Sequence, residues 1–248
     1  MGKDFQVARE AAVDATPEQV WDAIATGAGI DSWFMGNTRV DAERTITTAF
    51  GGYRAAHPVL AWEPGERLAY EDRDPASGRF VAYEFLIAGR SGGGAVLRTV
   101  TSGFLPGDDW ADEYEAMGYG LALFFDTLVA YLTHFTGRAA RPVTAFGPAV
   151  TDWPATWAAL HDRLGLTAPV AAGDRAHLTG PGGASTDAVV YHADPHTLGL
   201  RTAGALLRFL RGADGRLVAA HHLFDPTDHA DTTADAAAWQ AWLTATRS

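Results

Sequence analysis

Five histidines and four aspartates gather in a short part of the chain's second half. Imidazole and carboxylate groups that lie close together could bind a hydrolytic zinc ion or act as a general acid and base. Their spacing matches no closed ligand motif, and His221 and His222 are adjacent in a predicted strand, so they point to opposite faces. We therefore expect satisfied or surface histidines here, with no metal ligands and no catalytic residues. The set is His192, Asp194, His196, His221, His222, Asp225, Asp228, His229 and Asp231.

A second set of polar side chains lies on the predicted strands of the first half. Alternation along a strand decides which of them face inward, and the sequence does not fix that register. Those that face inward would orient a ligand in an otherwise apolar pocket; a structural or surface role is the alternative for each. No nucleophile is paired with a base at a recognisable spacing. The set is His57, Tyr70, Arg73, Tyr83, Glu84 and Arg98.

A long amphipathic helix is predicted over residues 108–136, and it would have to cover those strands. Acidic residues crowd its first turns, where they complement the helix dipole, and Gly137 marks its C-terminal end. Its large apolar residues recur at spacings of three and four, which form one broad stripe of an α-helix. They are Tyr114, Met117, Leu121, Phe124, Phe125, Leu128, Tyr131, Leu132 and Phe135.

Gly118 and Gly120 lie inside this helix, and each costs about 1 kcal/mol relative to alanine. Two such costs are large against a net domain stability of about 5–15 kcal/mol. Either close backbone packing or open space for a ligand beside the helix would offset them. The order of the elements before the helix favours the pocket.

That order is a strand, two short helices and a meander of antiparallel strands. Residues 5–13 alternate apolar and polar. Thr16, Pro17 and Gln19 have the pattern of an N-cap, an N1 proline and a capping box. Such a curved sheet packed on one long helix leaves a cavity between them. Turns rich in glycine, proline and aspartate separate about five predicted strands, at 39–49, 53–62, 67–72, 79–88 and 95–104.

Several short motifs follow one another in the first half: ATPEQVWDAI at 15–24, Trp33-Phe34, Gly51-Gly52, WEPGERL at 62–68, and Gly94 with the strand to Gly103-Phe104. In this order they resemble the SRPBCC (START-like, helix-grip) superfamily. Within it, the chain looks most like the family of the heat shock protein 90 ATPase activator C-terminal domain. The resemblance covers about residues 5–136. It implies an apolar ligand cavity and no catalytic triad, so it transfers a fold better than a function. Gly118-Tyr119 departs from the Gly-Trp of the family.

The expected fold is therefore α+β, with a curved antiparallel sheet around a long C-terminal helix over residues 1–137. The candidates for the ligand-binding cavity are mostly large apolar and aromatic residues, with a few polar ones. They are Trp33, Phe34, His57, Trp62, Tyr70, Tyr83, Phe85, Phe104, Tyr114, Met117, Gly118, Leu121, Phe124, Phe125 and Leu128.

The second half repeats the order of the first in a shorter form. Residues 138–142 are predicted to be a linker, and 143–248 a smaller, degenerate helix-grip unit with a shorter terminal helix. The segment 193–198 echoes 63–68, and 217–226 echoes 96–106. The alternative is extra α+β structure that merely packs beside the first unit. A unit with so few large apolar residues on its closing helix favours support or self-association over ligand binding.

Composition excludes several classes of function. The net charge of −11 and the pI near 5.1 argue against binding to nucleic acid or to an anionic membrane surface. Cysteine is absent, which excludes disulfides and thiolate ligands. The N-terminal residues carry no apolar signal region. We expect a cytoplasmic protein without a cofactor.

Three hypotheses for function remain. The first is non-enzymatic binding of a small hydrophobic or amphipathic molecule in the first unit's cavity. The second, implied by the resemblance, is a chaperone-associated interaction module. The third is an enzyme of the polyketide cyclase type, in which an inward-facing His57, tyrosine or arginine polarises a carbonyl group.

Overall fold

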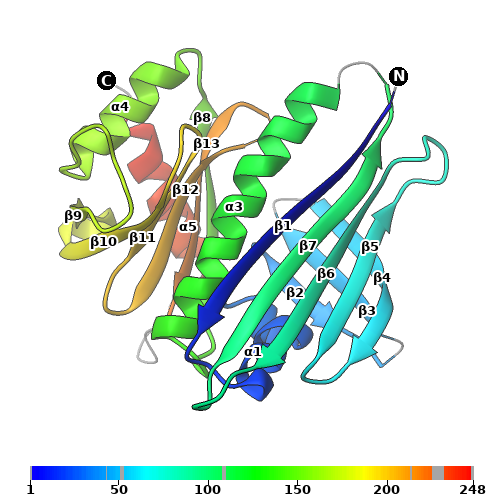
Figure 1. The fold of residues 1–248 in the computed structure, drawn as a ribbon. Helices are drawn as coiled ribbons and strands as arrows, with labels where there is room; N and C mark the ends of the chain where they lie inside the picture. The colour runs from blue at the N-terminus through cyan, green and yellow to red at the C-terminus, as the bar shows by residue number, and fades with distance from the viewer. Residues whose placement is uncertain are drawn as a thin grey trace. The chain divides into compact units, whose positions relative to one another are not determined.

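The structure is a computed structural model, and it describes residues 2–42, 44–50, 53–107, 110–212, 214–224 and 232–246. The chain divides into two compact units, Met1–Ala139 and Ala140–Ser248. Each unit contains one antiparallel sheet with helices, which confirms the predicted α+β class (Figure 1). The turn at Gly51-Gly52 and the residues Asp225, Asp228, His229 and Asp231 lie outside the described residues.

The first unit has a seven-stranded sheet of order β1-β7-β6-β5-β4-β3-β2. The first strand therefore lies beside the last, and the other strands follow in sequence. The closing helix α3 packs against β1 and β7. The elements are β1 (Lys3–Val13), α1 (Pro17–Ala25), α2 (Gly27–Ile30), β2 (Asn37–Val40), β3 (Thr45–Phe50), β4 (Tyr53–Glu63), β5 (Arg67–Arg73), β6 (Phe80–Gly89), β7 (Ala95–Leu105) and α3 (Trp110–His134).

The local signals at the helix ends operate as the sequence predicts. The Thr16 hydroxyl accepts the N–H of Gln19, and the Gln19 side chain accepts the N–H of Thr16, so both halves of the capping box are present. Gly137 follows α3 with φ = +76°, a conformation that glycine adopts without strain. These signals fix where α1 begins and where α3 gives way to the next segment.

The prediction of one strand over residues 39–49 is wrong. The structure has two strands there, β2 and β3, joined by a tight turn. Asp41 accepts the N–H of Thr45 through its carboxylate, and Arg44 has φ = +62°. The aspartate thus stabilises a turn inside a segment whose apolar and β-branched residues had suggested a continuous strand.

The second unit has the same topology with one strand fewer. Its six-stranded sheet has the order β8-β13-β12-β11-β10-β9, so again the first strand lies beside the last. Two helix-grip-like units in one chain agree with the predicted fold class. The elements are β8 (Arg141–Ala149), α4 (Trp153–Arg163), β9 (Arg175–Thr179), a 3-10 turn η1 (Pro181–Gly183), β10 (Ser185–Ala193), β11 (Thr197–Arg201), β12 (Ala205–Arg211), β13 (Arg216–Leu223) and α5 (Thr232–Thr244).

Two residues of the expected linker belong to this second sheet. Arg141 and Pro142 are the first residues of β8, and Pro142 is paired with His222 of β13. Proline cannot donate a ladder hydrogen bond, but β8 is an edge strand and tolerates it there. The proline that suggested a linker is therefore compatible with a strand.

The segment Glu113–His134 of α3 is long and apolar enough to cross a membrane by length and composition. Core helices of globular domains meet the same criteria. Leu123, Leu128 and Leu132 of this segment are buried in the first unit, where they pack as core residues do. We therefore interpret α3 as the core helix of its unit.

Candidate functional site

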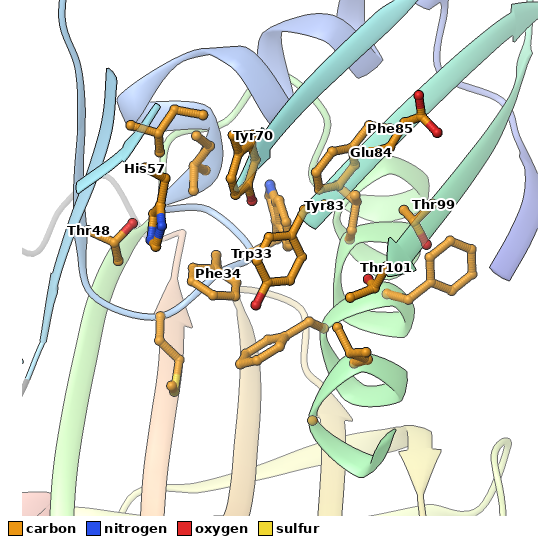
Figure 2. A pocket seen from close by; sticks show the side chains of 18 of the residues that line it. Trp33, Phe34, Thr48, His57, Tyr70, Tyr83, Glu84, Phe85, Thr99 and Thr101 are labelled. Atoms are coloured by element: carbon orange, nitrogen blue, oxygen red, sulfur yellow. The ribbon is translucent and has the colours of Figure 1, made fainter. Parts of the chain in front are cut away.

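The first unit contains a cavity of about 300 Å³ between the inner face of its sheet and α3 (Figure 2). Three regions supply its walls: strands β1 and β3–β7, the segment that follows α2, and the middle of α3. The lining residues are Val7, Arg9, Ile30, Trp33, Phe34, Met35, Ile46, Thr48, Phe50, His57, Tyr70, Asp72, Tyr83, Glu84, Phe85, Thr99, Thr101, Met117, Gly120, Leu121, Phe124, Phe125 and Leu128.

The register of the strands explains which side chains of the sheet face the cavity. Directly opposed residues of antiparallel strands have side chains on the same face. The pairs Tyr70–Tyr83 and Tyr83–Thr101 therefore form one inward row across β5, β6 and β7. The pairs Phe85–Thr99 and Thr99–Arg9 form the next row, which reaches β1. Alternation thus places aromatic rings, threonine hydroxyls and one guanidinium on the cavity side.

Trp33 and Phe34, which follow α2, form an aromatic wall of the cavity. The Trp33 indole donates a hydrogen bond of 2.9 Å from Nε1 to the carbonyl of Ala23, so its polar edge is satisfied and its ring is fixed. The ring centroids of Phe34 and Phe124 are 4.5 Å apart, and those of Trp33 and Phe85 are 6.1 Å apart. These contacts link helix, loop and sheet around the cavity, with the rings in edge-on and tilted orientations.

The glycines of α3 do not serve close backbone packing. Among the described residues, a Cβ atom at Gly118 would have no neighbouring heavy atom within 4 Å, and one at Gly120 would meet only Phe124 Cε2, at 3.9 Å. Gly120 lines the cavity. Of the two explanations left open by the sequence, open space is therefore the one that agrees with the geometry.

The polar part of the lining centres on His57 and Tyr70. Burial lowers the pKa of His57 from its usual value, against the opposing effects of the Asp72 carboxylate and the Glu71 backbone, so the ring is neutral at pH 7. The His57 Nδ1 atom is buried and has no hydrogen-bond partner among the described residues. Burial, together with nearby Tyr83, raises the pKa of the Tyr70 hydroxyl. Both groups are therefore neutral donors and acceptors at physiological pH.

Residues 14–133 match the model of the family "Activator of Hsp90 ATPase homolog 1-like protein". The sheet order, the two short helices after the first strand and the long closing helix are those of a helix-grip fold. The first unit is an SRPBCC domain. The resemblance seen in the sequence is thereby confirmed.

Solved structures match this SRPBCC domain or the whole chain. Protein MLL2253 from Mesorhizobium loti is 26% identical, with a TM-score of 0.43, and the match covers 52% of this chain and 96% of that one. The Aha1 dimer from Colwellia psychrerythraea is 18% identical over 52% and 96%, with a TM-score of 0.42. DynU16, from the dynemicin biosynthetic locus, is 18% identical over 96% of both chains, with a TM-score of 0.44. No curated protein matches the chain.

Most residues that the sequence nominates for the SRPBCC cavity lie in its lining; their role in binding stays a prediction. Trp62, Phe104, Tyr114 and Gly118 are not in the lining. Phe104 alternates with the inward residues of β7 and so faces away from the cavity. Those in the lining are Trp33, Phe34, His57, Tyr70, Tyr83, Phe85, Met117, Leu121, Phe124, Phe125 and Leu128.

Trp62 and Tyr114 are occupied by other contacts. The Trp62 ring lies edge-on to Trp21 of α1, with centroids 5.2 Å apart, and the Arg44 guanidinium lies 5.4 Å from its centroid. Tyr114 packs edge-on against Phe5, at 5.7 Å, in a small cluster near the start of α3. Both aromatics therefore belong to packed neighbourhoods outside the cavity.

The remaining polar strand residues do not present free groups to the cavity. The Glu84 carboxylate accepts a 2.7 Å hydrogen bond from Arg67 and points away from the cavity centre in Figure 2. Arg73 pairs with Glu71, at 3.0 Å, and Arg98 with Glu10, at 3.7 Å. Their charges are therefore balanced elsewhere on the sheet.

Sequence reasoning missed several lining residues, notably Arg9, Thr48, Asp72, Thr99 and Thr101. Thr99 and Thr101 stand at alternate positions of β7, and that alternation is a signal that could have found them. Arg9 and Asp72 could be placed only once the strand pairing was known. A charged residue in an alternating strand is usually assigned to the solvent side.

The histidines of the second unit do not form a metal site among the described residues. His192 Nε2 lies 3.0 Å from Asp194 Oδ2 and 2.8 Å from Thr197 Oγ1, in the turn between β10 and β11. Burial would raise the pKa of Asp194, but hydrogen bonds from His192, Thr197 and the His196 backbone outweigh it and lower the pKa. This network therefore stabilises a turn.

Three of these histidines are buried rather than on the surface, and His192, with its contacts to Asp194 and Thr197, is one of the satisfied side chains that the sequence led us to expect. His192 is 6% exposed, His221 1% and His222 0%. His221 and His222 are buried because β13 is an inner strand of the sheet whose middle residues are buried on both faces. His221 packs against Trp239, with ring centroids 4.1 Å apart. Burial, helped by the positive charge of Arg208, lowers the pKa of His221 to about 3.

Proposed function

We propose that the SRPBCC domain binds a small, largely apolar aromatic molecule in its cavity. The supporting observation is a cavity of about 300 Å³ whose walls are aromatic on three sides and whose polar groups are few and mostly neutral. Its volume is at the lower end of ligand-binding cavities, roughly 300–1,000 Å³. This size favours a compact ring system over a long acyl chain.

The lining favours rings for a physical reason. Trp33, Phe34, Phe85 and Phe124 present faces and edges in several orientations, so a planar ligand can stack on one and meet another edge-on. Burying apolar ligand surface contributes about 25 cal/mol per Å². The neutral His57 Nδ1 offers one hydrogen bond without the desolvation penalty of a charge. A ligand hydroxyl or N–H group would use it and fix the orientation of the ring.

The test is calorimetric titration of the full chain with a neutral aromatic probe, 2-naphthamide. Leu121 lines the cavity, so Leu121→Trp should fill it and weaken binding at least about 10-fold, a loss of about 1.4 kcal/mol. Leu60→Trp is the matched control, because Leu60 is 59% exposed and is not in the lining. Equal binding by both variants would show that the probe does not occupy this cavity.

Native mass spectrometry of protein purified gently from its host is the complementary measurement. A small molecule that is released on denaturation from wild type, and is absent from Leu121→Trp, would identify the ligand by mass. Release of the same molecule from both proteins would place it elsewhere.

A second candidate function is proton-transfer chemistry on a carbonyl compound in the same cavity. The observation that favours it is the presence of both His57 and Asp72 in the lining, with the carboxylate acting on the pKa of the imidazole. A neutral imidazole whose basicity is raised by a nearby carboxylate can remove a proton next to a carbonyl group. Turnover of a polyketone that is lost in His57→Ala, with ligand binding retained, would support this function. Turnover unchanged in that variant would exclude the role of His57.

A further inference from the structure

One cationic side chain in the cavity lining has no ion-pair partner in the part of the chain that the structure describes. Arg9 of β1 lines the cavity, and its Nε atom is buried without a hydrogen-bond acceptor among the described residues. None of the ion pairs in the described part of the chain includes Arg9. A buried guanidinium N–H without an acceptor is destabilising. An acceptor delivered by a ligand would remove that cost.

The carboxylates of the cavity lining, and that of the next residue in β1, are all engaged elsewhere. Glu10 follows Arg9 in β1 and therefore faces the other side of the sheet, where it pairs with Arg98 at 3.7 Å. Glu84 accepts from Arg67, at 2.7 Å. Asp72 lies 3.4 Å from Arg79. The positive charge of Arg9 is thus not matched by a carboxylate of the described residues.

The surroundings of Arg9 suit a small anionic oxygen group. Arg9 is directly opposite Thr99 in the β1–β7 pair, and Val7 is opposite Thr101, so the two threonine side chains share its face of the sheet. Each threonine hydroxyl is a donor that can rotate toward an oxygen atom. A guanidinium fork beside hydroxyl donors is a common recognition pattern for carboxylates.

This group is well separated from His57. Arg9 is on β1 and His57 is on β4, and the order β1-β7-β6-β5-β4 places four strand-to-strand steps between them. At about 4.8 Å per step, the separation measured along the sheet is roughly 19 Å. Arg9 and His57 are thus supplied to the cavity lining by strands that are far apart in the sheet order. The lining therefore carries the Arg9 guanidinium on β1 and the His57 imidazole, near Asp72, on the opposite side of the sheet order, with aromatic residues of the intervening strands between them.

We infer that the ligand of the cavity is an aromatic acid whose carboxylate is bound by Arg9 and Thr99. The inference rests on the proposed function, because it assigns a chemical class to the ligand of that same site. A carboxylate that meets Arg9 out of bulk water forms charge-assisted hydrogen bonds, which are stronger than neutral ones. The acid should therefore bind about 10- to 100-fold more tightly than its neutral amide.

The experiment compares 2-naphthoic acid with 2-naphthamide, which have the same ring and almost the same shape. Both are titrated calorimetrically into the full chain at pH 7.5 and low salt. The variants are Arg9→Met, which keeps an apolar stem and removes the charge, and Arg9→Lys, which keeps the charge. Arg98→Gln is the control, since Arg98 lies on the outer face of the same sheet and is paired with Glu10. Circular dichroism verifies that each variant is folded.

The expected result is a preference for the acid in wild type and in Arg98→Gln, lost in Arg9→Met and partly retained in Arg9→Lys. Affinity for the amide should change less than about 3-fold in all of them. If the amide binds wild type as tightly as the acid, or if Arg9→Met weakens both probes equally, the inference is overturned while cavity binding stands. If neither probe binds wild type, the proposed function fails and this inference fails with it.

Discussion

The two units share a topology but differ in what fills the space between sheet and closing helix. In the SRPBCC domain, α3 has 25 residues and leaves a cavity of about 300 Å³. In the second unit, α5 has 13 residues, and the space is occupied by aromatic side chains. The Phe209 and Trp242 rings are stacked with centroids 5.6 Å apart, and Trp239 lies edge-on to Trp242 at 5.4 Å.

This difference shows that the fold by itself does not create a binding site. Both sheets place their first strand beside their last, so both could surround a ligand. In the second unit, Trp157, Phe209, Trp239 and Trp242 belong to one continuous core, and that core closes the space. In the first unit, α3 has glycine rather than a larger side chain at position 120, which lines the cavity. Side-chain volume decides which unit is open.

The largest expected effect is a contrast in the cost of truncating a phenylalanine. Phe209 is 0% exposed and packed on three rings, so Phe209→Ala should destabilise the second unit by about 3–5 kcal/mol. Phe124→Ala should cost the first unit less, about 1–2 kcal/mol, because Phe124 already borders empty space and loses fewer packing contacts. Urea unfolding of both variants measures the difference. Equal losses would contradict the contrast between a closed and an open core.

The next effect is the acid sensitivity of the second unit. The pKa of His221 is about 3 in the folded protein and about 6.5 when unfolded. Between these values the unfolded chain binds one more proton, so this group's contribution to the free energy of unfolding falls as the pH falls. The slope is about 1.4 kcal/mol per pH unit. This contribution to the free energy of unfolding is fully present above about pH 6.5 and begins to fall near that pH.

His221→Gln tests this origin, because glutamine can still accept the backbone N–H of Arg208 that His221 Nδ1 accepts at 3.1 Å. Chemical unfolding between pH 7 and 5 should show a shallower pH dependence in His221→Gln than in wild type. His177→Gln is the matched control: His177 is an exposed histidine paired with Asp187. An unchanged slope in His221→Gln would assign the acid sensitivity to other groups.

Much of the fold could be predicted from sequence because its signals are local. The capping box at Thr16, the stripe of α3 and the glycine after it each act within one element. The aromatic and polar residues that face the cavity were harder to predict from sequence. Alternation along a strand defines two faces, and only the pairing of the strands determines which face is the inner one. Arg9 is a residue whose role could not be predicted from the sequence. Its importance depends on which carboxylates lie nearby in space, and the sequence neighbour Glu10 is on the wrong face.

The histidines of the second unit show a related limit. Sequence reasoning placed His221 and His222 on opposite faces but expected satisfied or surface side chains. Burial depends on whether β13 is a central or an edge strand, and its sheet position between β8 and β12 decides that. That property belongs to the assembled sheet and has no signature in the few residues around the histidines.

The last expected effect is a difference in sign when glycine is changed to alanine in each unit. Gly118→Ala should stabilise the SRPBCC domain by about 0.5–1 kcal/mol, because alanine favours the helix and its Cβ meets no neighbour within 4 Å among the described residues. Gly147→Ala should destabilise the second unit by about 1–3 kcal/mol, since its Cβ would lie 2.9 Å from the Leu217 carbonyl oxygen and 3.4 Å from Leu243 Cβ. Thermal and urea unfolding give the sign of each change. Opposite signs are expected because a Cβ atom has open space at Gly118 and meets backbone and side-chain atoms at Gly147, and a loss of stability in Gly118→Ala would mean that α3 is closely surrounded at that position.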